Sequence, residues 1–241
     1  MRWSIQPPRL HRAILKRVAS QYARHGWPVT PGAYRVGSRF RCDRAGCPIE
    51  RCHPALDDWQ TAASSDLAPI TRWWSERDHS VLLVTGATFD VIEVPGVLGA
   101  PAARALGRAA APCAVTPAGQ WMFFVRPGSA LRPELVGERR VLLHGPGSWV
   151  PAPPTQFPDG TVSWWIPPST VDWRLADPHR IQAALAEVTR RRNADARLSE
   201  GPPVTPRPMR HALVWPSTAD RSVGSSRRLR KRCRRSSYSH R

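Results

Sequence analysis

Three cysteines and a histidine lie close together in one loop of this chain. Cys42, Cys47 and Cys52 follow one another at intervals of five, and His53 comes directly after the last of them. Thiolate sulfur and imidazole nitrogen are the ligands that Zn²⁺ prefers, and four of them in a tetrahedron form a structural site. The pattern predicts a structural zinc site in the loop of residues 40–54. The alternative is a set of free thiols, because neighbouring side chains such as Cys52 and His53 diverge on an extended chain.

A second candidate site lies where apolar residues alternate with acids. Residues 81–84 read VLLV, residues 85–88 read TGAT and residues 89–95 read FDVIEVP, which predicts two short adjacent strands joined by a tight turn. Asp90 and Glu93 are three positions apart, so they point to opposite faces of a strand. Two carboxylates that clamp one divalent ion from a strand need a spacing of two, and at that spacing Glu93 meets Pro95. Glu93 is therefore either the remaining ligand of a metal site or a strand-end residue that faces solvent.

The C-terminal end of the chain is strongly basic. Residues 221–241 carry nine Lys and Arg side chains and no acid, which is half of the net charge of +18. Such a segment can bind nucleic acid, because each neutralised phosphate releases counterions. The alternative is a solvated tail with no specific partner. The candidate contacts to nucleic acid are Arg227, Arg228, Arg230, Lys231, Arg232, Arg234 and Arg235.

Composition limits the class of protein. A hydrophobic content of 41% and 11 Trp residues support a packed core, whereas 26 Pro residues argue against a helical bundle. No apolar stretch approaches the roughly 20 residues that span a bilayer, and no apolar leader follows Met1. The five cysteines are an odd number, which fits a reducing compartment better than a disulfide framework. We expect a cytoplasmic protein without membrane association.

The order of elements predicts an α+β fold with an antiparallel or mixed sheet flanked by helices. Residues 8–24 have apolar side chains every four positions, at Leu10, Ile14, Val18 and Tyr22. Further helices are expected over residues 66–76, 100–111 and 178–192, and strands over 81–84, 89–94, 114–116, 121–125, 141–143, 148–150 and 162–166. Residues 29–58 read as a loop. The prediction is one domain over residues 8–192 and a disordered basic tail over 193–241.

Two tryptophan pairs have two interpretations. Trp73-Trp74 and Trp164-Trp165 could stack on bases, as aromatic side chains do in proteins that bind single strands. Packing in the core is the competing interpretation for at least one member of each pair, because tryptophan buries a large apolar area.

Several segments, in this order, resemble the N-terminal domain of bifunctional DNA primase/polymerases, within the archaeo-eukaryotic primase superfamily. The resemblance covers residues 12–185 and rests on Tyr22–Val29, His53-Pro54, Trp73-Trp74, Leu82–Gly86, Phe89–Pro95, Thr116–Gly119, Gly145–Ser148 and Ala152–Thr155. It implies a two-layer domain with an RRM-like catalytic sheet. It also implies the ability to join nucleotides on a DNA template with Mg²⁺ or Mn²⁺.

Three positions depart from what the resemblance implies. The family's paired acids fall at Glu93 and Pro95, its phosphate-contacting histidine at Trp121, and its third acid at Leu142. One carboxylate of three is a poor site for two divalent ions, which need several oxygen ligands. The sequence therefore predicts a primase/polymerase-like domain with a degenerate active site that binds DNA, other nucleic acid or nucleotides, with Mg²⁺ or Mn²⁺ only if it is active. The alternative is a zinc-stabilised interaction or regulatory domain with no role in nucleic-acid binding.

Overall fold

A computed structural model describes residues 8–110 and 112–199. Its helices are α1 (Pro8–Arg24), α2 (Trp59–Ala62), α3 (Leu67–Glu76), α4 (Gly96–Leu106), α5 (Pro133–Val136) and α6 (Pro178–Ser199), with 3-10 turns at Gly107–Ala110 and Pro168–Val171. Its strands are β1 (Val29–Val36), β2 (Arg39–Arg41), β3 (His79–Val84), β4 (Asp90–Pro95), β5 (Cys113–Val115), β6 (Gln120–Val125), β7 (Leu142–His144), β8 (Trp149–Pro151), β9 (Gln156–Phe157), β10 (Gly160–Thr161) and β11 (Ser163–Ile166). The α+β class predicted from the sequence is confirmed.

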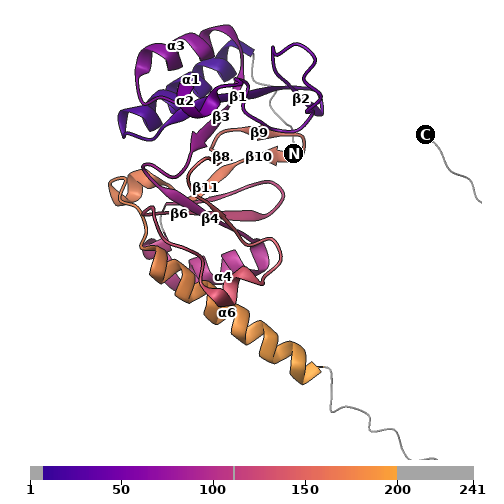
Figure 1. The fold of residues 1–241 in the computed structure, drawn as a ribbon, viewed down its shortest axis with the longest axis vertical. Helices are drawn as coiled ribbons and strands as arrows, with labels where there is room; N and C mark the ends of the chain where they lie inside the picture. Colours follow the sequence, from indigo (N-terminus) through magenta and orange to yellow (C-terminus); the bar gives the residue numbers. More distant parts are fainter. Residues whose placement is uncertain (1–7, 111, 200–241) are drawn as a thin grey trace, which may run out of the picture. The chain divides into compact units, whose positions relative to one another are not determined.

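The strands form two larger antiparallel sheets and one small hairpin. The first sheet has the order β2-β1-β3-β8, and the second has the order β11-β5-β6-β4-β7. Figure 1 shows α1 and α3 beside the four-stranded sheet, and α4 and α6 beside the five-stranded sheet. Strands β9 and β10 make the hairpin.

The prediction that residues 81–84 and 89–94 pair with each other is wrong. Strand β3 pairs with β1 and β8, whereas β4 pairs with β6 and β7 in the other sheet. The turn itself is tight, since the Gly86 amide donates to the Phe89 carbonyl. Gly86 has φ +103, and a Cβ there would lie 2.3 Å from the Cα of Pro146. The turn thus packs against the β7–β8 connection, and the chain crosses from one sheet to the other.

Strands β1 and β2 lie in the segment that we expected to be a loop. Pro31 and Gly32 interrupt the apolar pattern of β1, and both are depleted from strand interiors. Gly32 is needed because a Cβ there would lie 2.8 Å from the Leu82 side chain on the neighbouring strand. The glycine therefore marks a close approach of two strands.

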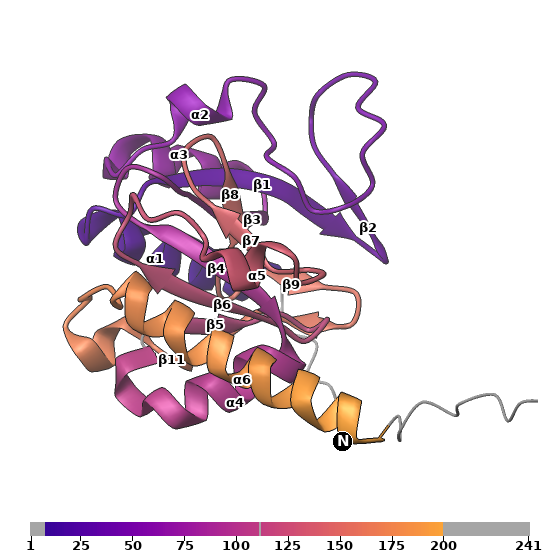
Figure 2. The same ribbon diagram turned by 60° about the horizontal axis from the view of Figure 1, so that its bottom comes forward.

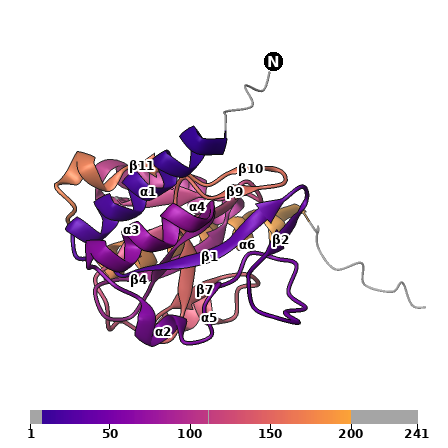
Figure 3. The same ribbon diagram turned by 90° about the horizontal axis from the view of Figure 1, so that it is seen from above.

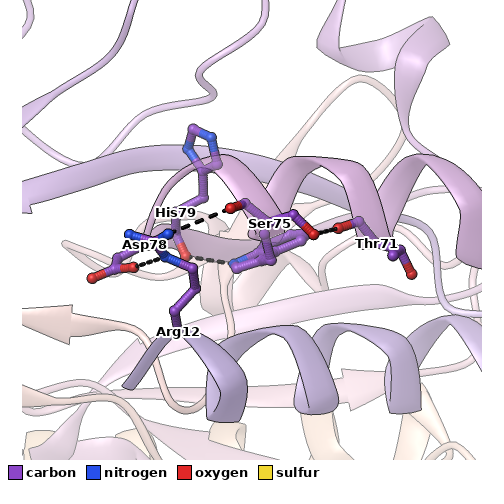
Figure 4. A network of polar contacts seen from close by, with 6 residues as sticks. Arg12, Thr71, Ser75, Asp78 and His79 are labelled. Carbon is purple, nitrogen blue, oxygen red and sulfur yellow. Dashed lines mark hydrogen bonds and ion pairs between the residues drawn. The ribbon is translucent and has the colours of Figure 1, made fainter. Parts of the chain in front are cut away.

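Helices α1 and α3 pack side by side over β1, as seen from above in Figure 3. Polar contacts at their ends fix this arrangement (Figure 4). The guanidinium of Arg12 donates to Asp78 at 2.6 Å and to the carbonyl oxygen of Ser75 at 3.4 Å. The Ser75 hydroxyl in turn donates to the carbonyl oxygen of Thr71 at 2.6 Å. Both helices are thereby tied to the start of β3.

The buried face of α1 differs from the predicted stripe. Leu10 is 49% exposed, whereas Leu15, Ala19 and Tyr22 are buried. A helix turns once per 3.6 residues, so a row of side chains spaced by four drifts around its axis. The helix was predicted with the right ends, but its apolar face is rotated.

An aromatic cluster joins the two sheets and α1. Trp27 is 2% exposed, and its ring centroid lies 5.9 Å from that of Tyr22, 4.7 Å from Phe89 and 5.2 Å from Phe124. Burial of a ring of this size contributes several kcal/mol, on the order of 3–5 when it is truncated to alanine. The cluster thus packs between the two sheets and holds them together.

Helices α4 and α6 pack against each other on the outer face of the five-stranded sheet (Figure 2). Ile181 and Leu185 are fully buried there. The helix continues to Ser199, beyond Asn193, where we expected disorder to begin. Residues 200–241, with the basic tail, lie outside the described residues. No helix among residues 8–110 and 112–199 is both long and apolar enough to cross a membrane.

Candidate functional site

Strand β4 places Glu93 on the face of the five-stranded sheet opposite to α4. Ile92 and Val94 belong to the core under α4 and α6, so Glu93 projects from the other side. The strand register pairs Glu93 with Met122 of β6 and with Leu142 of β7. Directly paired residues share a face, so the side chains of Met122 and Leu142 flank the carboxylate. Leu142 is 51% exposed.

A hydrogen-bonded chain runs from Glu93 through His144 to Ser148. The Nε2 atom of His144 lies 2.9 Å from Oε2 of Glu93, and its Nδ1 atom lies 2.9 Å from Oγ of Ser148. An ionised Glu93 accepts from the Nε2–H group, and a neutral ring then accepts the Ser148 hydroxyl at Nδ1. The chain links β4 and β7 to the start of β8, and thus one sheet to the other.

His144 is a residue of this site that was not predicted from the sequence. Its signal is the period of two on β7, because His144 is two positions after Leu142 and pairs with Val91. The prediction placed the functional position of this strand at Leu142 alone.

Asp90 lies on the opposite face of β4, as the spacing of three predicts. It is 2% exposed, and its Oδ2 atom accepts a hydrogen bond of 2.8 Å from the Gly128 amide. The register of β4 against β6 is continuous from Asp90 to Pro95, so no bulge turns Asp90 toward Glu93. Asp90 anchors a loop and does not supplement the Glu93 site.

Trp121 does not lie on the Glu93 face, which corrects the expectation that it fills the position of a phosphate-binding histidine. Trp121 pairs with Val94, and its ring packs in the core beside α4. A Cβ on Gly99 would lie 2.4 Å from the Cβ of Trp121, so only glycine permits this contact. The residues of β6 that share the face of Glu93 are Gln120, Met122 and Phe124.

Comparison with protein families gives one match. The model for the N-terminal domain of bifunctional DNA primase/polymerases matches residues 19–176, which is more than half of the chain. The chain belongs to this family. Comparison with curated proteins gave no match. The family membership implies a nucleotidyl-transfer site with divalent metal ions on the sheet that carries Glu93.

The residues at this site do not fit a pair of divalent cations. On the face in question β4 offers Val91, Glu93 and Pro95, β7 offers Leu142 and His144, and β6 offers Gln120, Met122 and Phe124. The one carboxylate in this set already accepts a hydrogen bond from the His144 ring. Two Mg²⁺ ions require several charged oxygen ligands to bind and to align an in-line attack. On this face the described strands β4, β6 and β7 thus supply one carboxylate, that of Glu93.

The cysteine loop brings three of the four predicted ligands together. The Sγ atoms of Cys42 and Cys47 and a ring nitrogen of His53 lie within 4.8 Å of one another. Cys47 Sγ is 3.5 Å from His53 Nε2. Zn–S bonds of about 2.3 Å and Zn–N bonds of about 2.0 Å at a tetrahedral angle give a sulfur–nitrogen separation of about 3.5 Å. This group could therefore hold a metal ion with little rearrangement.

The imidazole of His53 is oriented for this role. Its Nδ1 atom lies 2.7 Å from the Arg51 carbonyl oxygen, which can only accept a hydrogen, so Nδ1 carries the proton. The lone pair is then on Nε2, which faces the sulfur atoms. A backbone carbonyl that fixes the tautomer in this way is the usual second partner of a metal-bound histidine.

Cys52 is not part of the group, which corrects the prediction of a four-ligand site. Residues 53–55 run alongside β1, with hydrogen bonds from the Ala33 amide to the His53 carbonyl and from the Ala55 amide to the Pro31 carbonyl. Successive side chains of this extended segment point in opposite directions. Cys52 therefore lies beside Ser80 of β3, and burial raises the pKa of its thiol to about 12.

The charge around the loop favours a thiolate at Cys42. Burial acts to raise the pKa of Cys42, but hydrogen bonds, the strongest of them from Arg44, outweigh it and lower the pKa to about 6. The Arg44 guanidinium also donates to Asp57 and lies 3.6 Å from the sulfur of Cys47. Deprotonated sulfur is the form that binds metal.

Most of the paired tryptophans are structural. Trp73 and Trp74 are 8% and 0% exposed, and the Trp74 indole donates to the His79 carbonyl at 2.8 Å. Trp164 packs on Phe124 and donates to the Tyr22 hydroxyl at 3.2 Å. Trp165 is 50% exposed, so core packing accounts for one member of that pair and for both members of the other.

Proposed function

We propose that this chain is a primase/polymerase-like domain that binds nucleic acid or nucleotide but has lost most nucleotidyl-transfer activity. The observation that carries the proposal is the single carboxylate, Glu93, on the face where the family's chemistry requires several. Pro95 supplies neither charge nor an N–H group, and Leu142 presents apolar surface. Groups that act as one catalytic unit fail together, so even one such loss removes most of the rate.

The test is template-directed primer extension with Mg²⁺ or Mn²⁺. We expect no extension above background by the wild-type protein, by Glu93→Ala, or by the control Glu134→Ala, which changes an exposed acid on α5. A gain-of-function arm combines Pro95→Asp with Leu142→Asp, which returns carboxylates to both sides of Glu93. Robust extension by the wild type that Glu93→Ala abolishes and Glu134→Ala preserves would show that the enzyme is active.

A structural zinc ion in the cysteine loop is part of the proposal. Its support is the three-donor group of Cys42, Cys47 and His53. Loop residues 41–52 are all exposed or only partly buried, so the loop has little apolar core of its own. A bound metal ion would order the loop in place of an apolar core. Protein prepared under reducing conditions should carry close to one equivalent of zinc by elemental analysis, and a metal-free preparation would refute the proposal.

We infer that the basic tail supplies most of the non-specific affinity for DNA. Its support is the charge of residues 221–241, which include Arg227 through Arg235. A chain cut after Asp220 should bind DNA more weakly at low salt. The slope of log K against log salt should flatten by about 0.9 for each phosphate contact that is lost. An unchanged slope would assign the contacts to the folded domain. A cytoplasmic location, which keeps these cysteines reduced, belongs to the same proposal.

A zinc-stabilised interaction or regulatory domain with no nucleic-acid role is the second candidate. The cysteine loop favours it, because that loop retains its donors while the Glu93 site does not. Metal-loaded full-length protein that shows no salt-sensitive binding to single- or double-stranded DNA would support this second function over the first.

A further inference from the structure

The fourth position of the metal group is open to an external ligand. Zinc held by four protein ligands is structural, whereas zinc held by three keeps a position for water or another small ligand. The described part of the loop supplies Cys42, Cys47 and His53. Cys52 is directed toward Ser80 on the other side of its segment, so the nearest further sulfur cannot complete the tetrahedron without breaking the pairing of residues 53–55 with β1.

A cavity adjoins the two metal-binding sulfur atoms. Its volume is about 240 Å³, and its lining includes Cys42 and Cys47 together with Arg39, Arg41 and Arg44. Glu50 is the one acid in the lining, and it pairs with Arg39 at 2.8 Å. Arg41 is exposed, and among the described residues its guanidinium forms no hydrogen bond or ion pair, although its backbone pairs with Tyr34 of β1. Glu50 balances the charge of Arg39 and Asp57 that of Arg44, so the guanidinium of Arg41 is the excess charge that makes the cavity positive.

The charge of the metal group does not cancel that of the cavity. A divalent ion with two thiolates and a neutral imidazole is neutral overall, so the excess charge of Arg41 remains. Guanidinium binds phosphate oxygens through paired N–H groups, and a divalent zinc ion accepts an oxygen ligand in its open position. A ligand with an anionic oxygen for the metal and further oxygens for arginine therefore matches the cavity. Phosphate has this chemistry.

We propose that the metal ion held by Cys42, Cys47 and His53 binds a phosphate oxygen as an exchangeable fourth ligand, with Arg41 and its neighbours holding the remaining oxygens. This inference rests on the proposed metal and assigns the loop a ligand-binding role in place of a purely structural one. The phosphate can belong to a nucleotide, to a nucleic-acid strand or to free inorganic phosphate, because the three share the same oxygens.

The experiment uses the full chain loaded with Co²⁺ in place of zinc. Cobalt reports its own ligands through its visible absorption, and it broadens the ³¹P resonance of a phosphate that binds it. Addition of inorganic phosphate should change the visible spectrum and broaden the ³¹P line, and the zinc-loaded protein should leave the line sharp. Arg41→Gln should weaken the phosphate effect about tenfold while cobalt content stays at one equivalent, as expected for loss of one charge-assisted contact.

Two controls separate the alternatives. Arg104→Gln removes an exposed arginine on α4 and should leave the phosphate effect unchanged. Cys52→Ser should also leave the cobalt spectrum unchanged, and a lost sulfur band in this variant would show that Cys52 is the fourth ligand and overturn the inference. Cobalt uptake without any phosphate effect overturns the inference alone, whereas failure to take up cobalt overturns the proposed metal as well.

A competition series identifies the source of the phosphate. A deoxynucleoside triphosphate or a short single-stranded oligodeoxythymidylate is added to the cobalt protein with inorganic phosphate present. Displacement at the lowest concentration by the triphosphate assigns the cavity to nucleotides, and displacement by the oligonucleotide assigns it to a strand. Displacement by neither assigns it to free phosphate.

Discussion

The two candidate sites of this domain differ in their donor atoms and in the packing around them. The cysteine loop between β2 and α2 brings three donor atoms within 4.8 Å of one another, although every residue from 41 to 52 is exposed or only partly buried. The Glu93 site on β4 lies on a well-packed sheet, yet the described strands around it supply one carboxylate. The better packed region therefore has the fewer donor atoms, and the exposed loop has the more complete group.

The two regions also differ in what stabilises them. The strands around Pro95 and Leu142 need no metal ligands for their order, because they are held by their opposite face and by ladder hydrogen bonds. A cluster of carboxylates without its metal repels itself, so losing it relieves strain. The loop has no such support. Its order depends on its donors, on the Arg44–Asp57 pair and on a few turns, so loss of a donor affects the loop directly.

The largest expected effect tests whether the free energy of unfolding comes mainly from the aromatic core around Trp27 and not from either candidate site. Trp27→Ala should lower the free energy of unfolding by about 3–5 kcal/mol, because Trp27 contacts the aromatic side chains that join the two sheets. The measurement is denaturant unfolding followed by circular dichroism. Trp165→Ala, at a position that is 50% exposed, is the control and should cost less than about 1 kcal/mol. Equal losses in the two variants would contradict this account of the core.

The second prediction concerns removal of metal from the loop. A ligand that binds only the folded state adds about 2.7 kcal/mol when its free concentration is 100 times its dissociation constant. Chelation should therefore destabilise the wild type by about that amount and expose residues 42–52 to protease. Cys47→Ser should abolish the chelator effect, whereas Cys52→Ser and Glu93→Gln should retain it. A chelator effect that persists in Cys47→Ser would place the metal elsewhere.

The third prediction concerns the pH dependence of the unfolding free energy, through His79 beside the strand that leads to the cysteine loop. Burial lowers the pKa of His79, while its hydrogen bond to the Gly32 carbonyl and the charges of Asp43 and Glu76 oppose the shift and Arg77 adds to it. A histidine with a lowered folded pKa binds protons more readily in the unfolded state. Its contribution to stability is thus complete above the unfolded pKa of about 6.5 and is lost as pH falls from there through the folded pKa.

This loss should affect the strand that leads to the cysteine loop. His79 holds β1 at Gly32 with a bond of 2.9 Å. One proton limits the slope to about 1.4 kcal/mol per pH unit. His79→Gln should flatten the dependence of unfolding free energy on pH between 7 and 5, and His179→Gln on the exposed surface of α6 should not. An unchanged pH profile in His79→Gln would contradict the assignment.

Local features of the fold were predicted well from the sequence, but the pairing of the strands was predicted poorly. The ends of α1, the apolar stripe of α3 at Ile70, Trp73 and Trp74, and the hairpin of β5 and β6 all follow from periodicity and turn residues. The separation of β3 from β4 does not, because a tight turn between two apolar runs has the same pattern whether the strands pair or diverge. Hydrogen-bond partners that are distant in the sequence decide that question.

The same holds for the candidate sites, where local geometry could be predicted but contacts between distant segments could not. Spacing alone placed Asp90 and Glu93 on opposite faces and raised doubt about Cys52 beside His53. It could not reveal that Cys52 turns toward Ser80, which depends on the pairing of residues 53–55 with β1. Nor did it place His144 against Glu93, since that contact is set by the register of β4 with β7.

The smallest expected effect concerns the chain of hydrogen bonds at Glu93. Its carboxylate and the His144 ring retain 20% and 18% exposure, so water can replace either partner. Glu93→Ala should therefore cost only about 0.5–1.5 kcal/mol. A double-mutant cycle with His144→Ala should give a coupling energy of about 0.5–1 kcal/mol, because each single variant removes the same contact.

The size of that coupling tests how much the strand site still contributes. A small value fits a site whose carboxylate is held by a surface-accessible bond. A coupling above about 3 kcal/mol lies in the range of about 1.5–7 kcal/mol measured for close charge pairs at an interface. Such a value would mean that Glu93 and His144 form a fixed structural pair between the two sheets. The presence of the Glu93 carboxylate would then be explained by the stability that it gives the fold. The two sites would differ in whether the fold needs their ligand residues.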